Sequence, residues 1–304
     1  MTTVQPVRAV DRLSASEVSE VLALAAAAEE ADEVYPLSED VLLQVRHSSD
    51  AAVPGGSARV HLLSYVDDGL AGYAFLDRSD PEGPSGELVV APRLRLRGHG
   101  RALLAGAGAG PMRFWAHGDQ PAARAFAEKA GFARVRVLFQ MRRSLADPLP
   151  DAPLPAGVTL RGFRPGHDET AWLAVNARAF AHHPEQGRWT TADLEMREQE
   201  PWFDPAGFLL AVDIEDKLLG FHWTKVHPAT GEDPAIGEIY VLGVDPGGHR
   251  RGLGKALSVA GLQHLAGAGL TDAMLYADES NAAAVALYRG LGFDVYAADV
   301  SYQR

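Results

Sequence analysis

The same glycine-rich motif occurs twice in the chain, once in each half. Residues 97–103 read Arg-Gly-His-Gly-Arg-Ala-Leu, and residues 251–257, which lie 154 positions further on, read Arg-Gly-Leu-Gly-Lys-Ala-Leu. A second pair follows in the same order, because Ala-Gly-Phe at 130–132 matches Leu-Gly-Phe at 291–293 with a separation of 161 residues. A chain of 304 residues has room for about two domains. The repeat therefore predicts two copies of one fold.

Composition narrows the possible functions. The chain carries 28 basic and 40 acidic residues, a net charge of −12, which disfavours nucleic acid and anionic membranes as partners. It has no cysteine, which excludes disulfides, thiolate metal sites and a cysteine nucleophile. The apolar stretch at 21–28 is too short to span a bilayer, and acidic residues interrupt any resemblance to a secretion signal. We expect a cytoplasmic monomer.

A proline-rich stretch lies in the middle of the chain. Residues 144–157 contain four prolines, which disfavour a helix or a central strand and favour an extended connector. This predicts an N-terminal domain at 1–146, a linker at 147–156 and a C-terminal domain at 157–304. Each half has the pattern of a mixed α/β domain, with a strand, helical sequence, a strand hairpin, a long strand, a glycine-rich turn that opens a helix, and further elements after it. Before the hairpin we expect one helix in the first half (15–31) and two in the second.

The second glycine-rich motif has the features of an anion-binding turn. An apolar strand at 236–244 leads through Pro-Gly-Gly and basic residues into an apolar-periodic helix. Glycines let backbone N–H groups approach an anion, and a helix N-terminus adds unpaired donors and positive charge. The motif is not a nucleoside-triphosphatase loop, and Leu257 stands where a dinucleotide fingerprint needs its third glycine. The alternative, a plain glycine turn with solvated arginines, stays open on these residues alone.

Two strings resemble the GNAT superfamily of acyl-CoA-dependent N-acetyltransferases. Residues 250–257 are similar to its CoA-binding motif, and residues 281–293 are similar to its Asn...Tyr...Gly-Phe motif. The resemblance implies an α/β (α+β) protein of two tandem GNAT-like domains, each a mixed twisted sheet flanked by helices, with acetyl-CoA as cosubstrate. The residues it assigns to acetyl-CoA are, in the second half, Leu242, Gly243, Val244, His249, Arg250, Arg251, Gly252, Leu253, Gly254, Lys255, Asn281, Ala282, Ala283, Ala284, Val285 and Ala286, and in the first half Leu88, Val89, Val90, Leu96, Arg97, Gly98, His99, Gly100 and Arg101.

A closer resemblance concerns the acceptor. Residues 176–187, 221–225 and 238–241, together with the duplicated layout, are similar to tandem members of this superfamily that acetylate the cysteinyl amine of cysteinyl-glucosaminyl-inositol. The resemblance implies a small-molecule amine acceptor. The residues it assigns to acceptor binding are Glu39, Glu185, Lys225, Glu238 and Tyr276.

Acetyl transfer to an amine needs a base for the amine proton and stabilisation of the departing thiolate. Glu238 on the long strand is the candidate base, and Tyr288, which matches the family tyrosine, is the candidate acid, with an expected pKa near the ordinary value of about 10. A solvated strand-end glutamate and a packing tyrosine are the alternatives. Gly243 fits a bulge that would free backbone groups for the thioester. Asn281 fits a helix cap, a cofactor contact, or both.

Other patterns carry less chemistry. The adjacent pair His182-His183 lacks the partner spacing of a metal site, so we expect no metal. With separations of 154 and 161 residues, Pro84 stands in the first half at the position of Glu238, Ala127 at that of Tyr288 and Gln120 at that of Asn281. The first half is therefore expected to be non-catalytic but able to bind CoA. Two other functions remain open, a tandem GNAT acting on another amine such as an aminoglycoside or a peptide N-terminus, and a non-catalytic acyl-CoA sensor.

Overall fold

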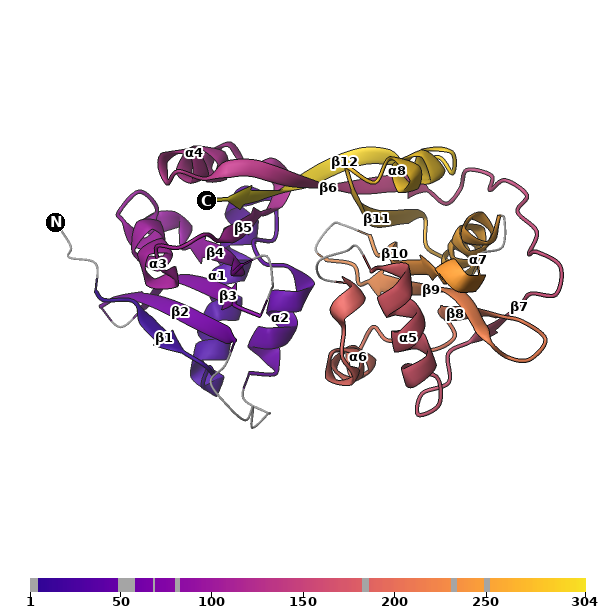
Figure 1. The fold of residues 1–304 in the computed structure, drawn as a ribbon. Helices are drawn as coiled ribbons and strands as arrows, with labels where there is room; N and C mark the ends of the chain where they lie inside the picture. The colour runs from indigo at the N-terminus through magenta and orange to yellow at the C-terminus, as the bar shows by residue number, and fades with distance from the viewer. Residues whose placement is uncertain are drawn as a thin grey trace. The chain divides into compact units, whose positions relative to one another are not determined.

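The computed structural model describes residues 5–48, 58–67, 69–79, 83–181, 186–230, 234–248 and 252–304. The chain divides into two units (Figure 1). Unit 1 comprises Met1–Leu138 and Ala297–Arg304, and unit 2 comprises Phe139–Tyr296. Both units are mixed α/β, as predicted from the sequence.

In the part of unit 1 that the structure describes, two α-helices pack on each face of the sheet. Its strand order is β1-β2-β3-β4-β5-β12-β6, with β4 and β5 parallel. Helices α1 and α2 pack with residues such as Tyr73 and Val89 on one face, whereas α3 and α4 pack with residues such as Leu76 and Phe114 on the other. The elements are β1 (Arg8–Val10), α1 (Ala15–Asp32), α2 (Glu39–Arg46), β2 (Arg59–Val66), β3 (Gly69–Asp77), β4 (Ser85–Val90), η1 (Pro92–Leu94), α3 (His99–Ala107), β5 (Arg113–Ala116), η2 (His117–Asp119), α4 (Pro121–Lys129) and β6 (Ala133–Ser144).

Helix α2 was not predicted, although its start signal is present in the sequence. Ser38 caps the helix by accepting a hydrogen bond from the Val41 backbone N–H, and two acidic residues follow in the first turn. The same device starts α1, where Ser14 and Glu17 form a capping box. Eight residues were too few for periodicity alone to reveal α2.

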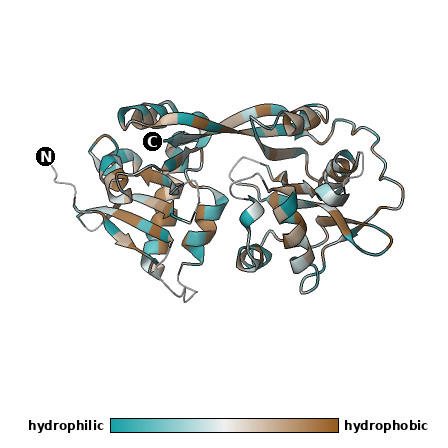
Figure 2. Cartoon of the chain, viewed as in Figure 1, coloured by the Kyte–Doolittle hydropathy of each residue, from teal (hydrophilic) through white to brown (hydrophobic). Residues whose placement is uncertain are grey.

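Unit 2 repeats this arrangement around a more aromatic core. Its strands follow the order β6-β11-β10-β9-β8-β7, and the central strands of both units are mostly hydrophobic (Figure 2). Trp172 of α5 and Trp223 of β9 are fully buried on the α5–α6 face, and α7 and α8 cover the opposite face. The elements are β7 (Thr159–Gly162), α5 (Glu169–Ala179), η3 (Gln186–Arg188), α6 (Thr191–Glu198), β8 (Phe208–Val212), β9 (Leu218–His227), β10 (Ile236–Val244), η4 (Pro246–Gly248), α7 (Leu253–Gly267), β11 (Asp272–Asp278), α8 (Ala282–Arg289) and β12 (Asp294–Gln303).

The division into units differs from the contiguous domains predicted at 1–146 and 157–304. Residues 297–304 belong to unit 1, because the second part of β12 pairs antiparallel with β5, Val300 opposite Ala116 and Gln303 opposite Arg113. Residues 139–146 belong to unit 2. The repeat in the sequence shows which segments are alike, but hydrogen bonding between strands decides which unit a strand completes.

The proline-rich stretch is extended but does not run free. Leu149 and Ala152 pack on the core cluster that contains α7 and α8, and Leu154 packs on the neighbouring cluster. The Arg143 guanidinium donates to the carbonyls of Asp147 and Leu291 and so holds the start of this stretch. The expected linker at 147–156 is therefore part of unit 2, since its apolar side chains alternate with the prolines and can be buried.

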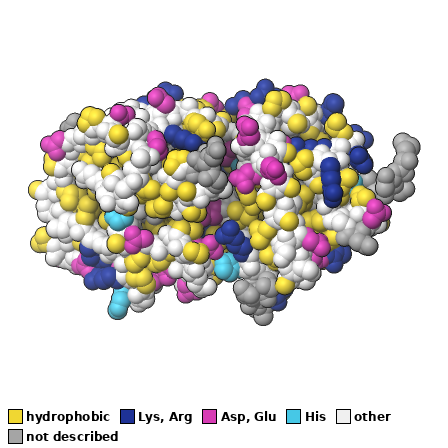
Figure 3. Space-filling model, turned by 180° about the vertical axis from the view of Figure 1, so that it is seen from behind, with side chains coloured by type: hydrophobic (Ala, Val, Ile, Leu, Met, Phe, Trp, Pro, Cys, Tyr) yellow, Lys and Arg dark blue, Asp and Glu magenta, His cyan; other side chains and the backbone are white. Residues whose placement is uncertain are grey.

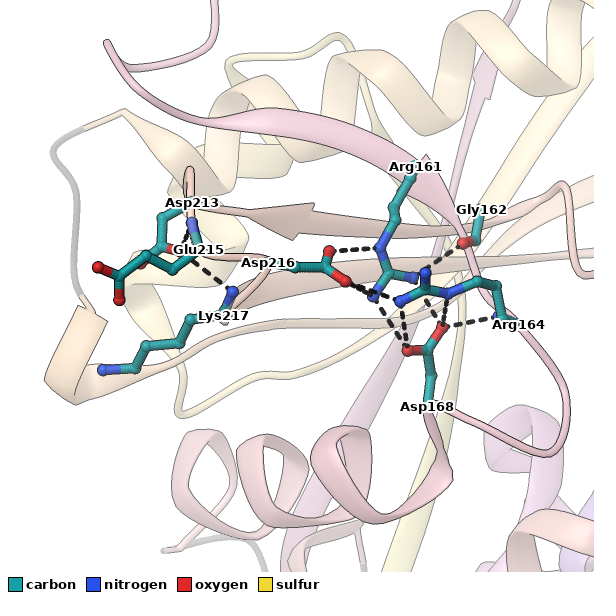
Figure 4. A network of polar contacts seen from close by, with 8 residues as sticks. All are labelled: Arg161, Gly162, Arg164, Asp168, Asp213, Glu215, Asp216 and Lys217. Atoms are coloured by element: carbon teal, nitrogen blue, oxygen red, sulfur yellow. Dashed lines mark hydrogen bonds and ion pairs between the residues drawn. The ribbon is translucent and has the colours of Figure 1, made fainter.

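An ion-pair network fixes the edge strand of unit 2 (Figure 4). The buried carboxylate of Asp168, at the start of α5, accepts hydrogen bonds from Arg161 of β7 at 2.7 and 3.0 Å. The exposed Asp216, in the β8–β9 turn, accepts from the same arginine at 2.8 Å and from Arg164 at 2.8 Å. The network joins β7, α5 and the β8–β9 turn.

Charged side chains of both signs are interspersed on the face of each unit seen in Figure 3. Among the described residues, no helix combines the length and hydrophobicity needed to cross a bilayer.

Candidate active site

Strands β10 and β11 of unit 2 run together and then part. Their parallel pairing covers Gly237, Glu238 and Ile239, while β10 continues beside β9 as far as Val244. Residues 240–244, which include the predicted acetyl-CoA contacts Leu242, Gly243 and Val244, thus extend beyond the paired part of β11. A strand edge of this kind offers backbone groups to an extended ligand.

The bulge in β10 lies at Tyr240 and not at Gly243. The register with β9 shifts between Ile239 and Val241, whereas Gly243 pairs regularly with Phe221. A Cβ atom at Gly243 would lie 2.8 Å from the Phe221 ring. The expectation that Gly243 forms the bulge was therefore wrong, and this glycine instead makes room for a core phenylalanine.

The Glu238 carboxylate is buried and hydrogen-bonded. Only 5% of the residue is exposed, and its Oε2 lies 2.7 Å from Nε2 of His227, whose side chain is 35% exposed. Burial alone would raise the pKa of Glu238, but the hydrogen bond and charge of His227, with the charge of Lys225, lower it below the ordinary value. The side chain is thus an anion at neutral pH. His227 was not predicted from the sequence, although its place two residues after Lys225 on one strand indicated the same face.

Lys225 lies directly opposite Glu238 in the β9–β10 pairing. Its Nζ is 4.7 Å from the Trp202 ring centroid and 5.2 Å from the Tyr240 ring centroid. The Tyr240 hydroxyl also accepts a hydrogen bond from Arg197 at 2.7 Å. Aromatic faces stabilise a buried cation, so the residue inserted at the bulge helps to hold the lysine beside the carboxylate.

Tyr288 approaches from the opposite face of the sheet. It belongs to α8 and to the core cluster of α7 and α8, where its ring packs edge-to-face on Phe293 at 5.9 Å between centroids. Glu238 shares the face of Lys225, Trp202 and Tyr240, which belongs to the α5–α6 side. Burial raises the pKa of Tyr288 to about 12, so the expectation of an ordinary pKa near 10 was wrong.

The predicted anion-binding turn leads into α7. Gly252 is the N-cap residue of α7, with φ of +87°. A glycine has no side chain to accept hydrogen bonds from the first turn, so the backbone N–H groups of Leu253, Gly254 and Lys255 suit an anion. The predicted contacts His249, Arg250 and Arg251 lie outside the described residues. Asn281 does cap α8, its Oδ1 accepting from the Ala284 N–H at 3.1 Å. Residues 282–286 form the first part of that helix.

The other residues predicted to contact the acceptor come from separate segments of the chain. Tyr276 follows the paired part of β11, is 42% exposed and accepts a hydrogen bond from Gln140 at 3.0 Å. Glu39 is the first residue of α2 in unit 1. Glu185 and the His182-His183 pair lie outside the described residues. No group of three metal-ligating side chains occurs in the part of the chain that the structure describes.

Unit 1 contains a cavity of about 880 Å³ at the corresponding place. Strand β4 pairs with β5 only from Ser85 to Glu87, and the cavity lies where they part, against α3 and α4. Gly98 is the N-cap of α3 with φ of +99°, as Gly252 is for α7. Of the first-half acetyl-CoA contacts predicted from the sequence, the cavity is lined by Leu88, Val89, Val90, Leu96, Gly98, His99, Gly100 and Arg101.

Among the described residues of unit 1, the position equivalent to Glu238 holds a serine. Ser85 pairs with Asp77 in β3–β4, at the position where Glu238 pairs with Lys225 in β9–β10. Because β10 has one extra residue at its bulge, the equivalent of Glu238 is Ser85 and not the predicted Pro84. Unit 1 holds a different polar cluster, in which His117, whose side chain is 13% exposed, lies between Asp299 at 3.0 Å and Glu87 at 3.6 Å. Glu87 also accepts a hydrogen bond from the Ser38 backbone N–H at 2.7 Å. This carboxylate therefore serves the N-terminus of α2.

Comparison with known proteins identifies the family. A sequence model described as the Acetyltransferase (GNAT) family matches residues 174–293. A mycothiol acetyltransferase of Salinispora arenicola is 57% identical over 97% of this chain and 95% of its own length, and that of Thermobispora bispora is 56% identical over 93% and 95%.

Solved structures agree on the fold. A GCN5-related N-acetyltransferase from Sphaerobacter thermophilus is 26% identical, covers 98% of this chain and 95% of its own, and superposes with a TM-score of 0.65. A tandem GNAT protein from the clavulanic acid biosynthesis pathway, 22% identical over 98% of each chain, reaches 0.68. The predicted tandem GNAT fold is confirmed, and the chain belongs to the mycothiol acetyltransferase family.

Proposed function

We propose that the protein transfers the acetyl group of acetyl-CoA to the cysteinyl amine of cysteinyl-glucosaminyl-inositol, giving mycothiol. The observation that carries this proposal is the parting of β10 and β11, with Glu238 on one face of the sheet and Tyr288 on the other. The family membership supports both the reaction and the acceptor. The absence of cysteine supports direct transfer from thioester to amine, without an acyl-cysteine intermediate.

In the proposed reaction the amine nitrogen attacks the thioester carbonyl, and Glu238 accepts the proton that the amine must lose. The carboxylate is ionised at neutral pH and so is ready to accept. The backbone of residues 240–244 and the first turn of α7 support binding of the extended cosubstrate and its diphosphate. The C–S bond then breaks, and CoA leaves as a thiolate.

Tyr288 assists the leaving group mainly as a hydrogen-bond donor. A thiol has a pKa of about 8.5, whereas burial raises the pKa of this phenol to about 12. Full proton transfer from the phenol to the thiolate would be uphill by about 5 kcal/mol. A hydroxyl held at the developing negative charge still stabilises it in the transition state.

The remaining roles stay predictions from the sequence. Glu39, Glu185, Lys225 and Tyr276 are proposed to bind the acceptor, whose ammonium and hydroxyls suit carboxylates and phenols. Unit 1 is proposed to bind CoA without turning it over, which the cavity and the serine at the position equivalent to Glu238 support. A cytoplasmic location and a monomeric state are proposed as well.

The acceptor is tested with acetyl-CoA and a set of amines, following the gain of one acetyl group by mass spectrometry. The set comprises cysteinyl-glucosaminyl-inositol, glucosaminyl-inositol, free cysteine, an aminoglycoside and a short peptide. We expect fast turnover of the first compound alone. Turnover of another amine with no acceleration by the first would refute the acceptor, and CoA binding without turnover of any amine would indicate a sensor.

The base is tested by Glu238→Gln. Removing a general base lowers kcat by about 10² to 10⁴. The KM for acetyl-CoA should stay unchanged, because the carboxamide retains the shape of the side chain. Turnover close to that of the wild type would refute the assignment.

A further inference from the structure

The proton accepted by Glu238 needs a way out. The ammonium of an amino acid has a pKa of about 8, whereas that of Glu238 lies below its ordinary value. Transfer to this carboxylate alone is uphill by at least about 3.5 pKa units. Glu238 is also almost wholly buried, at 5% exposed, so it has little direct contact with bulk water. The carboxylate can accept the proton in passing but is a poor place to keep it.

His227 provides the connection from this carboxylate to solvent. Its Nε2 lies 2.7 Å from Oε2 of Glu238, within the range of a strong hydrogen bond. The ring comes from the end of β9, where His227 pairs with Ile236. The His227 side chain is 35% exposed, while that of Glu238 is 7% exposed. The pair therefore spans the boundary between the buried site and water.

The neighbouring charge favours outward movement of the proton. Lys225 lies on the same strand two residues before His227, opposite Glu238, with its ammonium over the Trp202 and Tyr240 rings. A fixed positive charge next to the pair disfavours the proton on the inner carboxylate and favours its release through the outer imidazole. The groups that face the carboxylate are thus His227 and Lys225 from β9.

We propose that His227 is a proton-relay residue, which takes the amine proton from Glu238 and passes it to solvent. The proton moves from the amine nitrogen to a Glu238 oxygen, from Glu238 to Nε2 of His227, and from the other ring nitrogen, Nδ1, to water. The carboxylate is then ionised again, and reorientation of the partly exposed ring returns an unprotonated nitrogen to Glu238 for the next acceptor. This inference rests on the proposed function and on Glu238 as its base.

The alternative role is purely structural, in which the ring only orients the carboxylate. His264 gives a matched control in the same unit. Its side chain is 31% exposed, and its Nε2 lies 3.4 Å from Oδ2 of Asp204. Replacing it removes a half-exposed histidine paired with a carboxylate, away from Glu238.

The test compares His227→Gln and His227→Ala with His264→Gln, using acetyl-CoA and cysteinyl-glucosaminyl-inositol. We expect kcat of both His227 variants to fall about tenfold to a hundredfold, while the KM for acetyl-CoA changes less than twofold. The rate should then rise with the concentration of added imidazole in His227→Ala, because a small base can enter the vacated space. The acidic limb of the pH–kcat profile should also move relative to the wild type. His264→Gln should show none of these changes.

Two results would overturn the relay. One is a kcat for His227→Gln within twofold of the wild type; if His227→Ala then loses activity that imidazole does not rescue, the ring is a packing group. The other is a loss of the same size in His264→Gln. If the wild type does not acetylate this acceptor at all, the proposed function fails first, which the wild-type assay shows separately.

Discussion

The contact between α7 and β9 leads to a sharp prediction about one glycine. His222 of β9 is fully buried, and its Nδ1 lies 2.7 Å from the Leu257 carbonyl of α7. A methyl group at Gly261 would overlap the His222 ring at less than 3.0 Å from three of its atoms. Gly261→Ala must therefore push the helix from the strand or expel the ring. Both movements affect α7, whose first turn is the proposed diphosphate site.

The magnitude follows from two costs. Overpacking a core costs about 1–3 kcal/mol, and a broken hydrogen bond that leaves buried groups unpaired costs about 1–3 kcal/mol more. We expect Gly261→Ala to lose about 4 kcal/mol, a large part of the stability of an ordinary domain. The KM for acetyl-CoA should rise, because the N-terminus of α7 shifts.

Chemical denaturation followed by tryptophan fluorescence measures this loss. Four of the five tryptophans lie in unit 2, so the signal reports on the unit that contains α7. Gly267→Ala is the matched control, since it lies on the same helix with nothing within 4 Å of the added Cβ. The control should be neutral or more stable by up to about 1 kcal/mol. A Gly261→Ala protein within 1 kcal/mol of the wild type would refute the close packing of α7 on β9 at His222.

Three further predictions concern pH, the ion-pair network and the leaving group. Burial lowers the pKa of His222 to about 4, so the unfolded chain, with a value near 6.5, binds more protons between these limits. Stability should thus fall by about 2 kcal/mol from pH 7 to pH 5, and a His222→Asn protein should lose this part of the slope in denaturation. Asp168→Asn should cost about 2–3 kcal/mol because the buried Asp168 carboxylate is paired with Arg161, whereas Asp216→Asn, at an exposed residue, should cost much less; equal losses in thermal unfolding would refute the argument. Tyr288→Phe should lower kcat about tenfold to a hundredfold with the acetyl-CoA KM unchanged, and full turnover would leave the ring a packing group alone.

The sequence predicted the fold best where a local pattern alone decides it. The strand at 236–244 has the predicted bounds, and the helix predicted at 15–31 is α1 (Ala15–Asp32). Both follow from the pattern of apolar and polar residues within the segment itself. Residues 297–304, which include the second part of β12, belong to unit 1 because they pair with a strand far away in the sequence, and no local pattern encodes that pairing.

The candidate site shows the same limit at the level of single residues. Glu238 and Tyr288 were found through motifs, whereas His227 and the Glu87–His117–Asp299 cluster were not. The cluster joins residues up to 212 positions apart in the chain, and only the folded sheet brings them together. Burial likewise raises the pKa of Tyr288, so the hydrogen-bond donor role proposed for it depends on the structure and not on the motif.

The bulge at Tyr240 gives equivalent strand positions of the two units different surroundings. Val244 lies opposite Gly220, so a β10 strand without the bulge would have Glu238 opposite Val226. The Glu238 side chain would then face α7 and α8. The inserted residue places it opposite Lys225 instead, on the face with the aromatic residues and His227. In unit 1 the pairing of β3 with β4 runs without a shift from Gly72 to Asp77. A glutamate placed at Ser85 would therefore restore the residue type of the base but neither its lysine nor its histidine, so we expect Ser85→Glu in a Glu238→Gln protein to recover no turnover.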